Sequence, residues 1–233
     1  MTLKQHIKRM PILGPTATTL WQATRPLRFR LARFHSPDYW DSRYLQGGNS
    51  GAGSYGELAA FKAVILNDFV QQHRIDSVIE FGCGDGNQLA LSTYPAYVGV
   101  DISPAAIQLC QDRFRNDSSK KFLLYDSGKD LTQADLALSL DVIYHLVEDD
   151  IFERYMGSLF AAARRFVIIY SDNQEAVREA LHVRHRKFSD WVDENQPGWR
   201  LAQHILNDFP YDPATQTGSW SDFWIYEKTQ APS

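Results

Sequence analysis

The chain has 233 residues, of which 44% are hydrophobic and 13% aromatic, and its formal net charge is −4. This composition is typical of one globular domain with a short appendage. No apolar run reaches the roughly 18 residues of a membrane span, and no signal peptide opens the chain. Two cysteines do not suggest a disulfide framework, so we expect a cytoplasmic protein.

Positive charge is concentrated at the N-terminus. Up to Phe34 there are seven Lys or Arg and no acidic residue, which leaves 17 of the 24 basic residues against all 28 acidic ones in the rest. The arm 1–34 could therefore contact an anionic membrane or another polyanion, pack on its own body or a partner subunit of a homo-oligomer, or form a disordered tail. Packing of the arm on its own body or on a partner subunit is favoured, because the arm also contains the large apolar residues Leu20, Trp21 and Phe29, which a free tail rarely exposes.

The predicted elements begin after a glycine- and aromatic-rich stretch, 39–63, which leads into a helix ending near Gln72. The apolar runs then alternate with helix-like stretches. The predicted strands are 77–82, 97–103, 121–126, 134–140 and 165–172. The predicted helices are 87–93, 104–113 and 148–163, the second with Ser103 as N-cap and Pro104 in its first position. Strand-like stretches at 203–212 and 219–228 are joined by a short turn, so they must pair antiparallel.

This alternation predicts an α/β fold with a parallel sheet covered by helices on both faces. In such sheets, ligands bind beyond the carboxyl ends of the strands. Three glycines follow the first strand there, in "VIEFGCGDGN". Gly82 permits a tight turn, while Gly84 and Gly86 would allow a ligand to approach the backbone.

Two carboxylates narrow the kind of ligand. Asp101 ends the second strand 19 residues after Gly82 and could accept hydrogen bonds from both hydroxyls of a ribose. The Gly-x-Gly-x-Gly spacing differs from the dinucleotide fingerprint. Glu80 precedes the glycines and would repel a pyrophosphate, so it favours a nucleoside that carries positive charge.

Four motifs in this order resemble those of class I S-adenosylmethionine-dependent methyltransferases. They are "VIEFGCGDGN", "YVGVDIS", "FLLYD" and "ADLALSLDVIYHL", and the resemblance covers about 55–170. It implies S-adenosyl-L-methionine as cofactor and a Rossmann-like seven-stranded methyltransferase sheet with an antiparallel C-terminal hairpin. The implied domains are a basic arm (1–37), an N-terminal lid and helix (38–76) and the methyltransferase domain (77–233).

The resemblance also implies the cofactor-binding residues, which come from the motifs and from the lid. They are Tyr44, Tyr55, Glu80, Gly82, Cys83, Gly84, Asp101, Ile102, Asp126, Ser127 and Leu140.

An acceptor hydroxyl needs a base, and His145, just past the fourth strand, and His185 are the candidates. His182 and His185 are three residues apart and would share a helix face if this stretch were helical. Together with Tyr144, we expect His182 and Arg186 to bind substrate, Arg186 through a carboxylate or phosphate; a solvated basic helix surface is the alternative. Asp141, Asp172 and Asn173 roughly resemble the residues that hold magnesium in some O-methyltransferases, but Asp141 lies one residue later than in that pattern, so no metal site is predicted.

We therefore expect methylation, most readily at oxygen, of a small-molecule or saccharide acceptor. A noncatalytic cofactor-binding or interaction protein and a protein methyltransferase are the alternatives. Nucleic-acid substrates are disfavoured because the chain lacks Asn/Asp-Pro-Pro-Tyr and Pro-Cys motifs and its body is acidic.

Overall fold

A computed structural model describes residues 34–126, 132–175 and 178–229. One compact unit begins at Ser36. The basic arm up to residue 33 and Ser127 lie outside the described residues, so the predictions made for them are untested.

Nine strands form in the described part of the chain, and seven of them make one sheet in the order β3-β2-β1-β4-β5-β9-β8. The strands are β1 (Ser77–Phe81), β2 (Ala96–Asp101), β3 (Lys120–Leu124), β4 (Ala134–Leu140), β5 (Ala163–Ser171), β6 (Arg178–Ala180), β7 (Val183–Arg184), β8 (Trp199–Ile205) and β9 (Asp222–Lys228). The first five strands are parallel, and β9 pairs antiparallel with both β5 and β8. The predicted fold class and the antiparallel C-terminal pair are confirmed, but β8 ends at Ile205, so residues 206–221 connect the pair in place of the predicted short turn.

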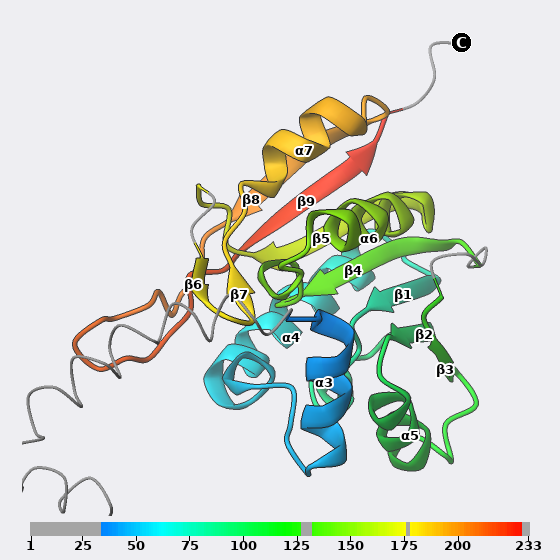
Figure 1. The fold of residues 1–233 in the computed structure, drawn as a ribbon. Coiled ribbons are helices and arrows are strands. Elements are labelled where there is room, and N and C mark those ends of the chain that lie inside the picture. Colours follow the sequence, from blue (N-terminus) through cyan, green and yellow to red (C-terminus); the bar gives the residue numbers. More distant parts are fainter. Residues whose placement is uncertain (1–33, 127–131, 176–177, 230–233) are drawn as a thin grey trace, which may run out of the picture. The chain divides into compact units, whose positions relative to one another are not determined.

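Helices and 3-10 turns alternate with these strands (Figure 1). They are α3 (Ser36–Leu45), η1 (Ala52–Ser54), α4 (Gly56–Gln72), η2 (Leu89–Leu91), α5 (Pro104–Arg113), η3 (Ile143–His145), α6 (Asp149–Ala161) and α7 (Phe188–Asn195). None of the helices in the described ranges is long and apolar enough to cross a membrane.

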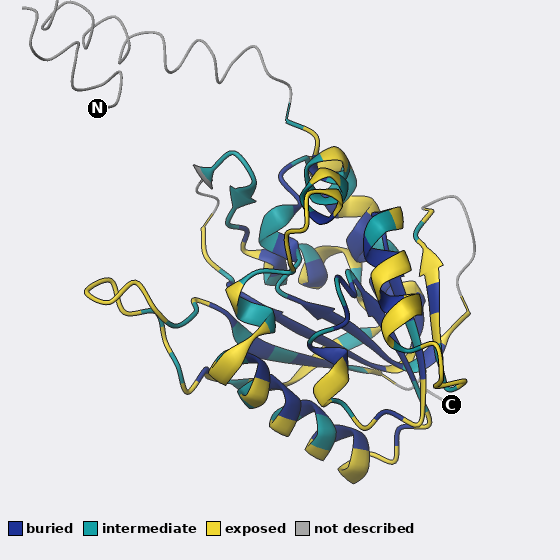
Figure 2. Ribbon diagram, turned by 90° about the horizontal axis from the view of Figure 1, so that it is seen from below, coloured by how far each residue is buried: buried dark blue, intermediate teal, exposed yellow. Residues whose placement is uncertain are grey.

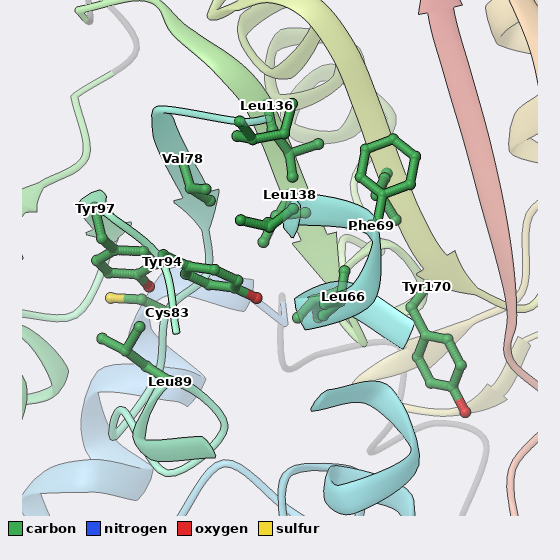
Figure 3. Packing of buried hydrophobic residues seen from close by; sticks show 14 of the residues in the cluster. Leu66, Phe69, Val78, Cys83, Leu89, Tyr94, Tyr97, Leu136, Leu138 and Tyr170 are labelled. Carbon is green, nitrogen blue, oxygen red and sulfur yellow. The ribbon is translucent and has the colours of Figure 1, made fainter. Parts of the chain in front are cut away.

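The sheet separates two hydrophobic clusters. Side chains alternate along a strand, so Ile168 and Tyr170 of β5 join the cluster under α4, while Val167 and Ile169 join the cluster under α6 and α7. Because both faces are covered, the central strands are mostly apolar, as in parallel sheets generally, with Glu80 and Ser139 as buried polar exceptions. Figure 2 shows these buried strands between helices whose outer faces are exposed. Figure 3 shows the α4-side cluster, where Tyr94 and Tyr97 pack near Cys83 of the glycine-rich loop.

One predicted helix is wrong, and a second stretch that was weighed as a helix is not one. The stretch 87–93 contains only the turn η2, because the chain must reach β2 quickly and Pro95 disfavours helical backbone just before it. The stretch containing His182 and His185 is not helical. His182 lies in the turn between the paired strands β6 and β7, and His185 follows β7. The two imidazoles therefore do not share a helix face.

Candidate active site

The glycine-rich loop lies at the carboxyl end of β1, next to the point where the strand order reverses between β1 and β4. The Gly82 amide donates to the Val100 carbonyl at 2.8 Å. The Gly84 amide donates to Asp101 Oδ2 at 3.0 Å, and Asp101 Oδ1 accepts from the Ser103 amide at 2.9 Å. Asp101 thus ties together the loops that follow two adjacent strands.

Glycine is required in this loop because protein atoms crowd it. Gly82 and Gly84 have φ of +78° and +58°, and a Cβ on Gly82 would lie 2.5 Å from Val142 Cγ2. A Cβ on Gly84 would overlap Ser50 Oγ and lie 3.0 Å from Tyr44 Oη. We expected the space beside Gly84 to admit a ligand; in the structure the segment before α4 takes that space.

This lid segment, residues 36–55, is fastened to the loop through Asp85. Asp85 Oδ2 accepts from the Ser50 amide at 3.0 Å and from Tyr55 Oη at 2.7 Å, and the Asp85 amide donates to Ser50 Oγ at 2.9 Å. Burial raises the pKa of Asp85, but these hydrogen bonds outweigh it and leave the pKa below its ordinary value. Burial and the bond to Asp85 raise the pKa of Tyr55 to about 12. Tyr44 Oη lies 3.1 Å from Ser50 Oγ, so Tyr44 and Tyr55 are both placed at the predicted cofactor loop.

Helix α3 of the lid segment is held at two further points. Ser36 Oγ donates to the Glu148 carboxylate at 2.6 Å, and its amide donates to the same carboxylate at 2.9 Å. Asp41 Oδ1 accepts from Ser103 Oγ at 2.7 Å. The lid segment therefore contacts the loops after β1, β2 and β4.

The acidic groups near the loop suit a cationic nucleoside. Asp101 is buried, and each of its oxygens accepts a hydrogen bond from a backbone amide, while a carboxylate oxygen can accept more than one. Glu80 is buried below the loop and accepts from Tyr97 Oη at 2.7 Å; burial raises its pKa to about 7. Asp41, Asp85 and Asp101 thus place three carboxylates around the loop. The residues present thus fit S-adenosylmethionine. Asp101 would accept hydrogen bonds from the ribose hydroxyls, and the other acidic residues would lie near the positive charges of the cofactor.

The other predicted cofactor residues lie around the same loop or at strand ends. Cys83 and Leu140 are buried in the α4-side cluster. Ile102 is half-buried after β2, and Asp126 is exposed after β3.

A buried ion pair that sequence reasoning missed lies beyond β4. Lys62 Nζ of α4 contacts Asp141 Oδ2 at 2.6 Å, and Asp141 Oδ1 accepts from Tyr144 Oη at 3.1 Å and Ser221 Oγ at 3.3 Å. Asp141 has φ of +58°, and a Cβ on Gly53 of the lid segment would lie 2.6 Å from its carboxylate. The sequence signal that could have indicated this ion pair is a lysine on the apolar face of the helix α4.

His145 is embedded among aromatic rings. Its Nδ1 lies 2.9 Å from the His182 carbonyl, which can only accept, so Nδ1 carries the proton. The Trp40 ring meets His145 edge-on at 4.7 Å, and Tyr39 stacks on His182 at 4.9 Å. Burial lowers the pKa of His145 to about 4, which makes it a weak base.

His185 has a different environment. Its Nδ1 forms a hydrogen bond with Asp172 Oδ2, and both side chains are largely buried, 12% and 3% exposed. Asp172 directly follows β5, at the same sheet edge as Asp141.

The remaining predicted substrate residue, Arg186, is bound to protein groups. Its guanidinium donates to Asp149 Oδ1 at 2.7 Å and to the carbonyls of Leu146 and Val147, and it stacks over Phe152. These contacts give it a structural role at the start of α6. The expectation that it holds a substrate group receives no support from this geometry.

The two aspartates that follow β4 and β5 are both engaged with protein groups. Asp141 is paired with Lys62 and Asp172 with His185. Across the described ranges, no group of three or more His, Cys, Asp or Glu side chains is arranged to hold a metal ion.

The strand order, the glycine-rich loop and the Asp101 carboxylate together define a class I S-adenosylmethionine-dependent methyltransferase. Residues 72–219 match the family model described as "Methyltransferase domain", and the chain belongs to that family, whose cofactor is S-adenosylmethionine. No curated protein matches the chain in sequence.

Solved structures share the fold at low identity. Magnesium protoporphyrin IX methyltransferase (ChlM) from Synechocystis PCC 6803 with bound SAM superposes with a TM-score of 0.61 at 14% identity, over 85% of this chain and 99% of that one. The methyltransferase domain of bacterial CtHen1-C gives 0.57 at 17% identity, over 72% and 97%. These likenesses support the fold and not an acceptor.

Proposed function

We propose that the protein transfers the methyl group of S-adenosylmethionine to an oxygen of a small-molecule or saccharide acceptor, with His185 as general base. The observation that carries this proposal is the pairing of His185 with the buried Asp172 carboxylate. A hydroxyl acceptor needs a base, whereas an amine or thiolate already offers a lone pair.

The pairing prepares His185 for this task. Because a carboxylate accepts, Asp172 favours the tautomer in which Nδ1 carries hydrogen and Nε2 presents the lone pair. The carboxylate also stabilises the imidazolium that forms when Nε2 takes a proton. His145 is less suited, since its Nδ1 contacts only a neutral carbonyl and its pKa lies near 4.

When bound, the cofactor supplies a methyl carbon whose bond to sulfur breaks, with the electron pair staying on sulfur, as an oxygen lone pair forms the new C–O bond. The hydroxyl proton passes to His185 Nε2 and from there to solvent. Asp101 would hold the ribose, and the lid segment would limit water at the site through its contacts with Gly84 and Asp85.

The test uses the full chain, methyl-labelled S-adenosylmethionine and an extract of the host cells, with the labelled product analysed by mass spectrometry. We expect label in a base-stable methyl ether, and we expect His185→Gln and Asp172→Asn each to lower turnover about 10²-fold or more. The matched control is His204→Gln. His204 also contacts an aspartate, Asp222, at 2.9 Å, but it lies on the edge strand β8 and is more exposed. Label on nitrogen or carbon, or full turnover by His185→Gln, would show that the proposal is wrong.

A further inference from the structure

The connection between β8 and β9 carries a second surface at the same end of the sheet. Residues 206–221, which we call the aromatic loop, contain Phe209, Tyr211 and Trp220, two aspartates, and no Lys or Arg. In Figure 1 the aromatic loop extends outward from the region where β5 and β9 meet the β6–β7 hairpin. Its position is beyond the strand ends that carry Asp141 and Asp172.

The aromatic loop is held in one conformation by its own hydrogen bonds. The Asp212 amide donates to the Thr217 carbonyl at 2.8 Å, and Asp212 Oδ1 accepts from the Ala214 amide at 2.8 Å. Gly218 has φ of +85°, and a Cβ there would overlap the Pro210 carbonyl. A surface that is ordered before binding loses less entropy when a ligand arrives.

Two aromatic rings of this loop pack against each other at the surface, one exposed and one half-buried. Tyr211 and Trp220 lie 4.7 Å apart with an interplanar angle of 32°, and Trp220 is 52% exposed. Phe209, by contrast, packs toward Phe61 of α4 at 6.1 Å. Phe209 and Tyr211 are both half-buried, so Trp220 is the exposed ring of the three, with Tyr211 packed beside it. Exposed Trp and Tyr are the residue types that most often dominate recognition surfaces.

The base of the aromatic loop is joined to the candidate active site. Ser221 follows Trp220 directly, and its Oγ contacts Asp141 Oδ1, which also accepts from Tyr144. Asn207, at the other end of the loop, donates through its amide to Asp222 Oδ1 at 2.8 Å. A ligand on Tyr211 and Trp220 can thus extend toward the acceptor side of the site.

The chemistry of the surface indicates its ligand. Without Lys or Arg, the loop has no cation to bind a phosphate backbone or an anionic lipid. Flat aromatic faces pack against the C–H faces of sugar rings, and neighbouring Asp, Thr and Gln side chains can bond sugar hydroxyls. We propose that Tyr211 and Trp220 form a saccharide-binding platform that holds the distal part of an uncharged glycan acceptor. This inference rests on the proposed function and narrows its acceptor class.

The test is saturation-transfer NMR and calorimetry on the full chain with three neutral probes: cellotetraose, maltotetraose and chitotetraose. We expect at least one probe to bind, and Trp220→Ala to weaken its binding by roughly tenfold. Leu206→Ala is the matched control, because Leu206 is 67% exposed on the same loop but has no aromatic face; it should bind normally. Thermal unfolding of each variant checks that the fold is intact.

Binding of none of the three probes would overturn the inference. So would a change of oligomeric state on Trp220→Ala without loss of saccharide binding, which would make the loop a subunit contact. Because binding is measured without methyl transfer, the two proposals fail separately. A saccharide that binds through Trp220 while the label goes to nitrogen overturns the proposed O-methylation alone.

Discussion

Replacing Lys62 with methionine removes one half of a buried ion pair while keeping most of the side-chain volume. The Lys62 side chain is 1% exposed and that of Asp141 is 9% exposed. Breaking a buried pair by removing one partner costs about 3–5 kcal/mol, because the other charge stays uncompensated. Asp141 keeps hydrogen bonds from Tyr144 and Ser221, so we expect the lower end, about 3 kcal/mol. For a chain of this size, that corresponds to a fall in Tm of roughly 6–12 °C.

Urea unfolding followed by circular dichroism measures this loss, with Asp141→Asn completing a double-mutant cycle. Asparagine tolerates the left-handed backbone of residue 141, so the amide removes the charge without new strain. The double variant should recover most of the stability lost in Lys62→Met. Lys121→Met, on an exposed position of β3, should change the free energy of unfolding by less than about 0.5 kcal/mol. A cost below about 1 kcal/mol for Lys62→Met, or no recovery in the double variant, would refute the reasoning.

Three further substitutions test the loop and its surroundings, and Gly157→Ala serves as a control for the first. Gly84→Ala places a non-glycine residue at φ +58° and its Cβ against Ser50. Titration calorimetry should therefore show weaker S-adenosylmethionine binding, and differential scanning calorimetry should show a lower Tm. Gly157→Ala, where an added Cβ contacts no other atom, should instead stabilise α6 by up to about 1 kcal/mol. Folded Glu80 keeps its proton up to about pH 7 while the unfolded chain loses it near pH 4.5, so its contribution to stability falls by about 3 kcal/mol as pH rises through that range. The difference between wild type and Glu80→Gln should follow this slope; a flat difference would contradict it. Ser103→Ala removes the α5 N-cap and should cost about 1 kcal/mol in urea unfolding; no cost would show that the cap is dispensable.

Local signals in the sequence predicted the sheet well. Strands buried on both faces are continuous apolar runs, and β4 coincides with its predicted range. Helix α5 also has its predicted bounds, because Ser103 accepts from the Ala106 amide and Pro104 begins the helix. The sequence did not predict the strands after β5, because the pairing of β6 with β7 and the contact of His182 with His145 are tertiary features.

The candidate site depends on contacts between residues far apart in the chain. Lys62 and Asp141 are 79 positions apart, and neither position alone indicates the other. His185 was a predicted base, but its partner Asp172 was considered only as a metal ligand, because sequence spacing could not bring the end of β5 to the segment after β7. The glycines were recognised from their spacing. The residue that leaves no room for a side chain at Gly84 is Ser50, which lies 34 positions earlier in the lid segment, and the sequence does not show that this segment packs on the loop.

The most direct measurement of the central claim is isothermal titration calorimetry of the full chain with S-adenosylmethionine and S-adenosylhomocysteine. Both should bind, and Asp101→Ala should lose about 1.5–3 kcal/mol, the range for hydrogen bonds to a charged group, with its fold intact by circular dichroism. Absence of binding at millimolar ligand by the wild-type protein, or unchanged affinity in Asp101→Ala, would contradict the assignment of this loop as the cofactor site.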